Sequence, residues 1–156
     1  MAEDTAEVPV QAARRVVIPR AEAATVAGVG IAAVAASSLW TTHAVQHGPQ
    51  LCPLRALTGL PCPGCGLTRS WVFAAHGDLA SAFGFNAFGP VFFAVLLVAA
   101  LVAGWTLISG RRGGWDRMRS VVVGPVGIVL IVAWLGYGVV RIVDGIAGWG
   151  LFPTVT

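Results

Sequence analysis

Residues 90–109 read PVFFAVLLVAALVAGWTLIS, twenty residues without a single charged side chain. At a rise of ~1.5 Å per residue, a helix of this length spans ~30 Å, the thickness of the hydrocarbon core of a bilayer. Two further apolar runs of similar length are Ala23–Trp40 and 121–140. The sequence therefore predicts an all-α integral membrane protein with three transmembrane helices, at about residues 23–42, 90–109 and 121–143.

The composition agrees with a membrane protein and argues against a nucleic-acid partner. Of the 156 residues, 56% are hydrophobic and 11% are charged, whereas a soluble domain carries about 25% charged residues. The ten basic residues are all arginines, and most stand in short blocks beside the apolar runs. Such blocks are typical of topology signals and of contact with lipid headgroups. The lipid bilayer is therefore the expected partner.

The N-terminal part holds a polar tail and the weakest apolar run. Residues 1–20 are expected to be a disordered tail, and residues 21–156 a single membrane domain. Within the first run small residues recur every fourth position, which predicts a face for self-association or for contact with another membrane helix. This face consists of Ala24, Gly28, Ala32 and Ala36. A cleaved signal peptide is the alternative interpretation of this run.

The distribution of arginines predicts the orientation in the membrane. Seven arginines lie before the first span or in the turn before the third, and three lie in the first connection or at the C-terminal end. Arginine-rich flanks stay in the cytoplasm. The expected location is therefore the plasma membrane of a bacterium, with the N-terminus cytoplasmic and the cysteine-containing connection, residues 48–88, extracytoplasmic.

That connection contains all three cysteines, Cys52, Cys62 and Cys65. Its four prolines argue against a regular helix before Gly64. From Leu67 to His76 a short helix is expected, and Asp78 is suited to cap a second one. The apolar character of both segments predicts a short interfacial helical hairpin between the first and second spans.

Three kinds of chemistry fit these cysteines. Cys62-Pro63-Gly64-Cys65-Gly66 has the form of a zinc or iron knuckle, in which the turn directs backbone N–H groups at the sulfurs. Zinc is the cofactor this interpretation predicts, with Cys52, Cys62 and Cys65 as ligands and His76, or else His47 or His43, as the fourth.

The second interpretation is thiol–disulfide exchange, and the third is structural. A CxxC pair at the start of a helix has a stabilised thiolate, so Cys62 and Cys65 would react and Cys52 would be the third thiol. In the structural interpretation the cysteines only pin a turn, Arg69 binds carbonyls or a phosphate, and Asp78 caps its helix.

The run from Cys52 through CPGCG-x-TR (residues 62–69) to Gly77-Asp78 and Asn86 resembles a bacterial membrane family known as domain of unknown function 2752. The family often has Asn-Pro where this chain has Asn86-Ala87. The resemblance implies a small multi-span membrane protein without an assigned reaction. The residues marked on this basis, together with the two glycines of the turn, are Cys52, Cys62, Gly64, Cys65, Gly66, Thr68, Arg69, Asp78 and Asn86.

These observations favour a non-catalytic role. No phosphate-binding loop, carboxylate pair or Ser-His-Asp set is recognisable in the sequence. The expected function is a membrane interaction or scaffold module whose extracytoplasmic hairpin is stabilised by cysteines. A membrane thiol–disulfide oxidoreductase and a zinc- or iron-binding membrane protein are the alternatives.

Overall fold

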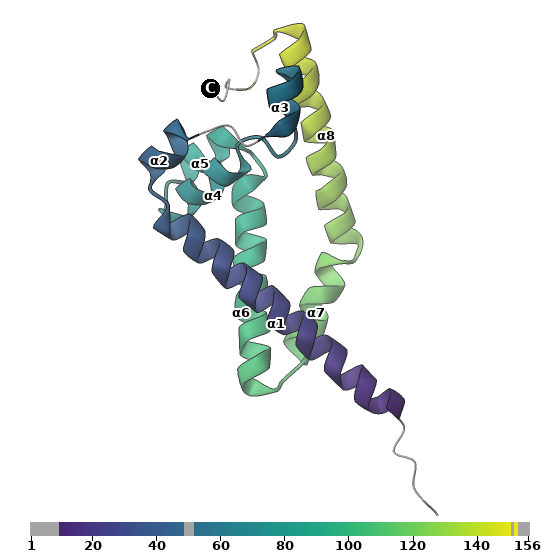
Figure 1. Cartoon of the computed structure of the whole chain (residues 1–156). Coiled ribbons are helices and arrows are strands. Elements are labelled where there is room, and N and C mark those ends of the chain that lie inside the picture. The colour runs from purple at the N-terminus through teal and green to yellow at the C-terminus, as the bar shows by residue number, and fades with distance from the viewer. Residues whose placement is uncertain (1–9, 49–51, 151, 153–156) are drawn as a thin grey trace, which may run out of the picture.

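The chain is described by a computed structural model covering residues 10–48, 52–150 and 152 (Figure 1). These residues form helices and no strand, which confirms the all-α prediction. The helices are α1 (Val10–Leu39), α2 (Thr42–His47), α3 (Pro53–Thr58), α4 (Leu67–Ala75), α5 (Leu79–Phe85), α6 (Gly89–Ser109), α7 (Gly113–Val122) and α8 (Pro125–Ala147).

Three helical segments are long and apolar enough to cross a membrane. They are Arg20–Leu39 within α1, Gly89–Ser109, which is α6, and Gly113–Ala147, which contains α7 and α8. The prediction of three spans is therefore confirmed. Helix α1 begins at Val10, so residues 10–20 are helical rather than part of a disordered tail, and residues 1–9 lie outside the described residues.

The arginine-rich segment before the third span differs from the short turn expected there. Residues 113–122 form helix α7, which buries Trp115 against α1 and α6 and exposes its arginines. The chain bends between α7 and α8 at Gly124, because Pro125 has no N–H to continue the helical hydrogen bonds of α7. An amphipathic helix therefore stands where arginines and glycines indicated a loop.

Helix α1 crosses α6 along a face of small residues (Figure 1). Ala23, Ala27 and Ala103 are buried there, and Gly30 touches Ala100 so closely that a Cβ at position 30 would lie 2.5 Å from the Ala100 Cβ. Small residues permit this close approach. The face expected for self-association lies beside this one on α1. Its four residues, Ala24, Gly28, Ala32 and Ala36, are exposed. Its contact with another helix stays a prediction.

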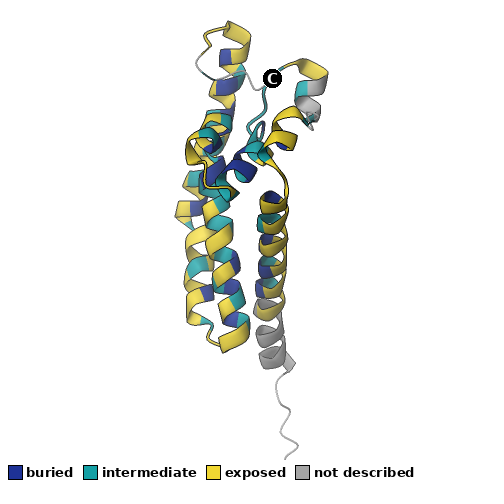
Figure 2. Cartoon of the chain, turned by 90° about the vertical axis from the view of Figure 1, so that its left-hand side faces the viewer, coloured by how far each residue is buried: buried dark blue, intermediate teal, exposed yellow. Residues whose placement is uncertain are grey.

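The apolar surface of the spans is open to its surroundings, as a bilayer requires. Figure 2 shows exposed residues along most of α8, with buried residues gathered where the short helices meet the spans. Large exposed side chains on α8 include Ile128, Val132 and Val139. These faces fit association with lipid, in which exposed apolar side chains are stable.

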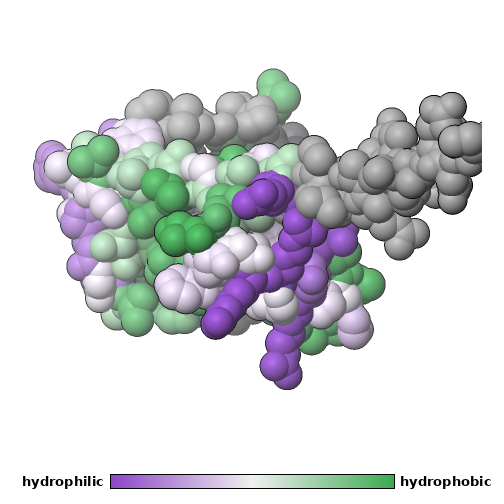
Figure 3. Space-filling view, turned by 90° about the horizontal axis from the view of Figure 1, so that it is seen from below, coloured by the Kyte–Doolittle hydropathy of each residue, from purple (hydrophilic) through white to green (hydrophobic). Residues whose placement is uncertain are grey.

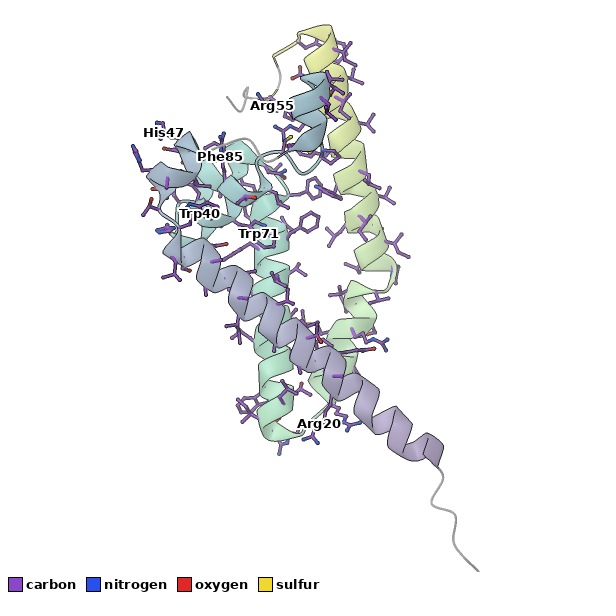
Figure 4. All side chains as sticks on the ribbon, viewed as in Figure 1. Arg20, Trp40, His47, Arg55, Trp71 and Phe85 are labelled. Atoms are coloured by element: carbon purple, nitrogen blue, oxygen red, sulfur yellow. The ribbon has the colours of Figure 1, made fainter. Side chains whose placement is uncertain are left out.

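The two ends of the molecule differ in charge. The end that carries the α6–α7 turn presents a group of hydrophilic side chains (Figure 3), and there Arg119 forms an exposed ion pair with Glu22 at 3.4 Å. Arg20 lies towards this end, whereas His47 and Arg55 lie at the other (Figure 4). The short helices α2 to α5 thus lie away from most of the arginines.

The connection between α1 and α6 contains four short helices. The expected helix from Leu67 to His76 is α4, which ends at Ala75, and the helix capped by Asp78 is α5, which continues past Gly84 to Phe85. Helices α2 and α3 were not expected, and for α3 the prolines of the connection argued against a helix. Pro53 occupies the first turn of α3, where a missing N–H disrupts nothing.

The contact between α1 and α6 predicts a position-specific effect of a larger side chain. Gly30→Val should lower the free energy of unfolding in detergent by about 1–3 kcal/mol, because the added methyl groups overlap Ala100. Gly28→Val is the matched control, since a Cβ at Gly28 meets nothing within 4 Å. Thermal unfolding of both variants measures the difference, and equal destabilisation would contradict this packing.

Candidate metal centre

A tight turn places Cys62 and Cys65 side by side. We call residues 59–66 the cysteine elbow. The Cys65 N–H donates to the Cys62 carbonyl at 3.0 Å, and the Leu67 N–H donates to the Gly64 carbonyl at 3.0 Å. Gly66 then has φ +82°, a left-handed conformation that glycine adopts without strain, and α4 begins at the next residue.

The elbow directs backbone donors at sulfur, as expected for a knuckle. The Cys62 N–H donates to Sγ of Cys65 at 3.1 Å, and the backbone of Gly64 acts to lower the pKa of Cys62. Such N–H groups stabilise negative charge on sulfur. The local backbone is therefore suited to hold two thiolates.

Cys52 brings a third sulfur to the same point. It immediately precedes α3, and its Sγ lies 3.1 Å from that of Cys62, which lies 3.2 Å from that of Cys65. All three sulfurs lie within 4.8 Å of one another, and Cys65 is 5% exposed. Sulfurs that bind one tetrahedral zinc ion at ~2.3 Å are about 3.8 Å apart, so the two short separations would widen by about 0.6 Å around an ion.

In the absence of a metal ion, the surroundings of Cys62, the central thiol of the cluster, oppose its ionisation. Burial raises the pKa of Cys62 to about 12, and hydrogen bonds with Cys52 and Cys65 and the charge of Cys65 act in the same direction. The Gly64 N–H acts in the opposite direction, with a smaller effect. Cys62 is therefore protonated at neutral pH unless a cation replaces the proton.

Asn86 connects the elbow to the start of α6. Its side chain is 0% exposed, and Nδ2 donates to the carbonyls of Pro63 at 3.0 Å and Cys65 at 3.2 Å. Its Oδ1 accepts the Phe88 N–H at 3.0 Å. Asn86 thus uses both ends of its amide to fix the elbow against the second span.

Helix α8 holds the elbow from the other side. Trp134 donates from Nε1 to the Pro63 carbonyl at 3.2 Å, and Arg141 donates from a guanidinium nitrogen to the Cys65 carbonyl at 2.9 Å. Gly138 and Gly145 lie against Pro63 and Pro61; a side chain at Gly138 would collide with Pro63, and one at Gly145 would be in tight contact with Pro61. These four residues follow one face of α8 at spacings of four, three and four.

Sequence reasoning did not connect this face of α8 with the cysteines. Arg141 and Asp144 stand three residues apart, a spacing that suggests a pair on one helix face at the membrane edge, but Arg141 is 3% exposed and contacts the elbow. Two signals were present in the sequence. An arginine interrupts an otherwise apolar run, and two glycines stand seven residues apart on the same helix face.

The other predicted residues lie away from the sulfurs or serve the local backbone. Asp78 caps α5, accepting from the Ser81 N–H at 3.0 Å and the Ser81 hydroxyl at 2.6 Å, and these bonds lower its pKa. Arg69 donates to the Val45 carbonyl at 3.1 Å and so ties α4 to α2. Thr68 is exposed on the first turn of α4.

His76 is not brought to the cysteines. It forms the C-terminal cap of α4, and its Nδ1 lies 2.8 Å from the Val72 carbonyl. In the described part of the chain, the group of potential metal ligands consists of Cys52, Cys62 and Cys65. The fold therefore brings three of the predicted ligands together, two from the elbow and Cys52 from the start of α3.

The fold and this site define a class: a three-span helical membrane protein in which a cluster of three cysteines lies at an elbow docked on the spans. The model of the family described as protein of unknown function (DUF2752) matches residues 52–100, which confirms the resemblance noted in the sequence. The match covers the elbow, α4, α5 and the first half of α6. Comparison with curated proteins and with solved structures gave no match.

The elbow predicts unequal effects at two glycines of similar conformation. Gly66 and Gly77 both have φ +82°, but a Cβ at Gly66 would collide with the Phe85 carbonyl oxygen, and one at Gly77 meets nothing within 4 Å. Gly77→Ala should cost about 1–2 kcal/mol of backbone strain, and Gly66→Ala about 1–3 kcal/mol more.

Thermal unfolding of the two alanine variants in the same detergent measures this difference. If Gly66→Ala is no more harmful than Gly77→Ala, the close packing of the elbow on α5 is contradicted.

Proposed function

We propose that Cys52, Cys62 and Cys65 bind a single metal ion of the zinc class as thiolates. In this role the ion fastens the connection between the first two spans to the membrane helices. The observation that carries the proposal is the convergence of three sulfurs within 4.8 Å of one another, with a backbone N–H directed at one of them. Thiolate-rich tetrahedral sites suit zinc or iron.

The chemistry of the donor set fits such an ion. Burial and the neighbouring thiols oppose ionisation of Cys62, whose pKa is raised to about 12. A divalent cation removes that penalty because it neutralises the charge that the thiolates would otherwise share. When bound, the ion would supply a cross-link between the start of α3 and the elbow. The elbow carbonyls already bind Asn86, Trp134 and Arg141, so the cross-link would extend to α6 and α8.

Thiol–disulfide exchange receives less support from the geometry. An attacking thiol reacts as its thiolate, and a pKa of about 12 leaves Cys62 almost entirely protonated at neutral pH. Arg69, which could have lowered that pKa, instead donates to the Val45 carbonyl. The closeness of the sulfurs alone favours exchange, so oxidation of the pair is an outcome that the experiment below must detect.

The purified full-length protein should contain one zinc ion per chain. Cys52→Ser, Cys62→Ser and Cys65→Ser should each lose most of that zinc, because each removes one of three ligands. His76→Ala is the matched control and should keep it, since His76 lies outside the cluster. Elemental analysis combined with intact-mass measurement tests both interpretations. Metal-free protein carrying an intramolecular disulfide would contradict the metal centre and support exchange.

We further propose that the elbow lies on the extracytoplasmic side of a bacterial plasma membrane, with the N-terminus in the cytoplasm. Support comes from the arginines near the α6–α7 turn, since arginine-rich ends stay in the cytoplasm. In an oxidising compartment, unprotected thiols form disulfides, and metal binding would keep these three reduced.

Labelling of intact cells tests this orientation. Leu57→Cys, at an exposed position of α3, should react with a membrane-impermeant maleimide, whereas Arg111→Cys in the α6–α7 turn should not. The wild-type chain gives the background from the native cysteines. Labelling of Arg111→Cys without labelling of Leu57→Cys would reverse the orientation.

A further inference from the structure

Arg141 is a buried cation without a carboxylate partner among the described residues. It is 3% exposed, and its bonds are one hydrogen bond of 2.9 Å to the Cys65 carbonyl and contacts with two aromatic rings. The rings are those of Tyr137 and Phe152, 5.6 Å and 5.9 Å from the guanidinium carbon. Its Nε has no hydrogen-bond partner. The one ion pair found in the described part of the chain joins Arg119 and Glu22.

Asp144 forms no ion pair with Arg141. It is also buried, three residues further along α8, but its carboxylate accepts the Phe152 N–H at 3.3 Å rather than pairing with Arg141. A guanidinium keeps its charge at any pH that proteins tolerate, and a buried charge without a counter-charge is costly. The fold therefore places a permanent positive charge in a buried position where no described carboxylate forms an ion pair with it.

The carbonyl that Arg141 binds belongs to Cys65, one of the three residues of the cluster. Three thiolates and one divalent ion carry a net charge of −1, which is the complement of one guanidinium. We infer that Arg141 is the counter-cation of the metal-loaded cluster. This inference rests on the proposed metal centre and deepens it, because it assigns the charge of the occupied site.

Arg141 acts as a positioning residue and is not a ligand. Its guanidinium offers donors only, so it cannot bind a cation. It holds the Cys65 carbonyl and supplies positive charge in a region of low dielectric constant, where charges interact strongly. Binding is reciprocal, so a metal ion that gains affinity from Arg141 also strengthens the docking of α8 on the elbow.

The experiment compares two occupants of the same three sulfurs that differ in net charge. A zinc cluster carries −1. Arsenite, As(OH)3, reacts with three thiols to form a neutral cluster: three As–O and three S–H bonds break, three As–S bonds form, three waters leave and no electron is transferred. Loss of the positive charge at position 141 should therefore lower the affinity for zinc and leave the affinity for arsenite unchanged.

Full-length protein in detergent is compared with Arg141→Gln and Arg141→Lys. Chelator competition should show zinc binding weakened about 10- to 100-fold in Arg141→Gln, the range found for groups that support metal ligands. Arg141→Lys keeps the charge and should recover most of that loss. Arsenite affinity, measured by protection of the thiols from alkylation, should be the same in all three proteins, which also shows that the sulfurs remain assembled.

Two results would overturn the inference alone. Either equal zinc affinity of Arg141→Gln and the wild type, or an equal loss of zinc and arsenite affinity in Arg141→Gln, would remove the charge role. The second result would indicate that Arg141 only maintains the shape of the elbow. Failure of the wild-type protein to bind zinc would instead overturn the proposed function, and the inference with it.

Discussion

The backbone carbonyls of Pro63 and Cys65 join the elbow to the segment before α6 and to α8, and the rest of the site depends on these bonds. The tight turn between the cysteines directs these carbonyls away from the elbow's own backbone. Buried carbonyls need donors, and few are available where spans meet lipid. Asn86, Trp134 and Arg141 supply them, from the segment before α6 and from one face of α8. Providing donors for the carbonyls of this one turn therefore connects the start of α6 with α8, although α6 and α7 separate them in the chain.

The same constraint explains which small residues matter. Gly138 and Gly145 let the prolines of the elbow approach the α8 backbone, and Gly66 lets the chain turn into α4 beneath the Phe85 carbonyl. Larger side chains there would push the elbow away from its donors. The aromatic contacts Phe92–Trp134 and Phe88–Tyr137 add apolar packing between α6 and α8 beside these hydrogen bonds. Polar bonds set the register of the elbow on α8, and the rings fill the space around it.

Much of the local structure could be predicted from the sequence, because it depends on neighbouring residues. Hydropathy located the spans, Asp78 and Gly77 marked the boundaries of α4 and α5, and the CxxC spacing indicated a turn that brings two sulfurs together. Helix α7 was missed because its glycines and arginines are typical of loops, while burial of Trp115 against the spans stabilises it as a helix. The contact of Arg141 with Cys65 joins residues 76 positions apart, and no local pattern encodes such a pairing.

The site is thus a junction where the residues that could bind a metal ion lie next to those that connect the elbow to the spans. The cysteines lie on the elbow and before α3, and the carbonyls of the elbow reach α6 and α8. Whatever occupies the sulfurs therefore influences the arrangement of the spans. A metal ion would convert the three thiols into a charged cluster matched by a buried arginine, and would make the junction rigid.

X-ray absorption at the zinc edge of the full-length protein in detergent tests this account most directly. It predicts three sulfur neighbours at about 2.3 Å from zinc and one lighter neighbour at about 2.0 Å. A zinc shell made only of nitrogen and oxygen neighbours would contradict the account, as would protein that takes up no zinc.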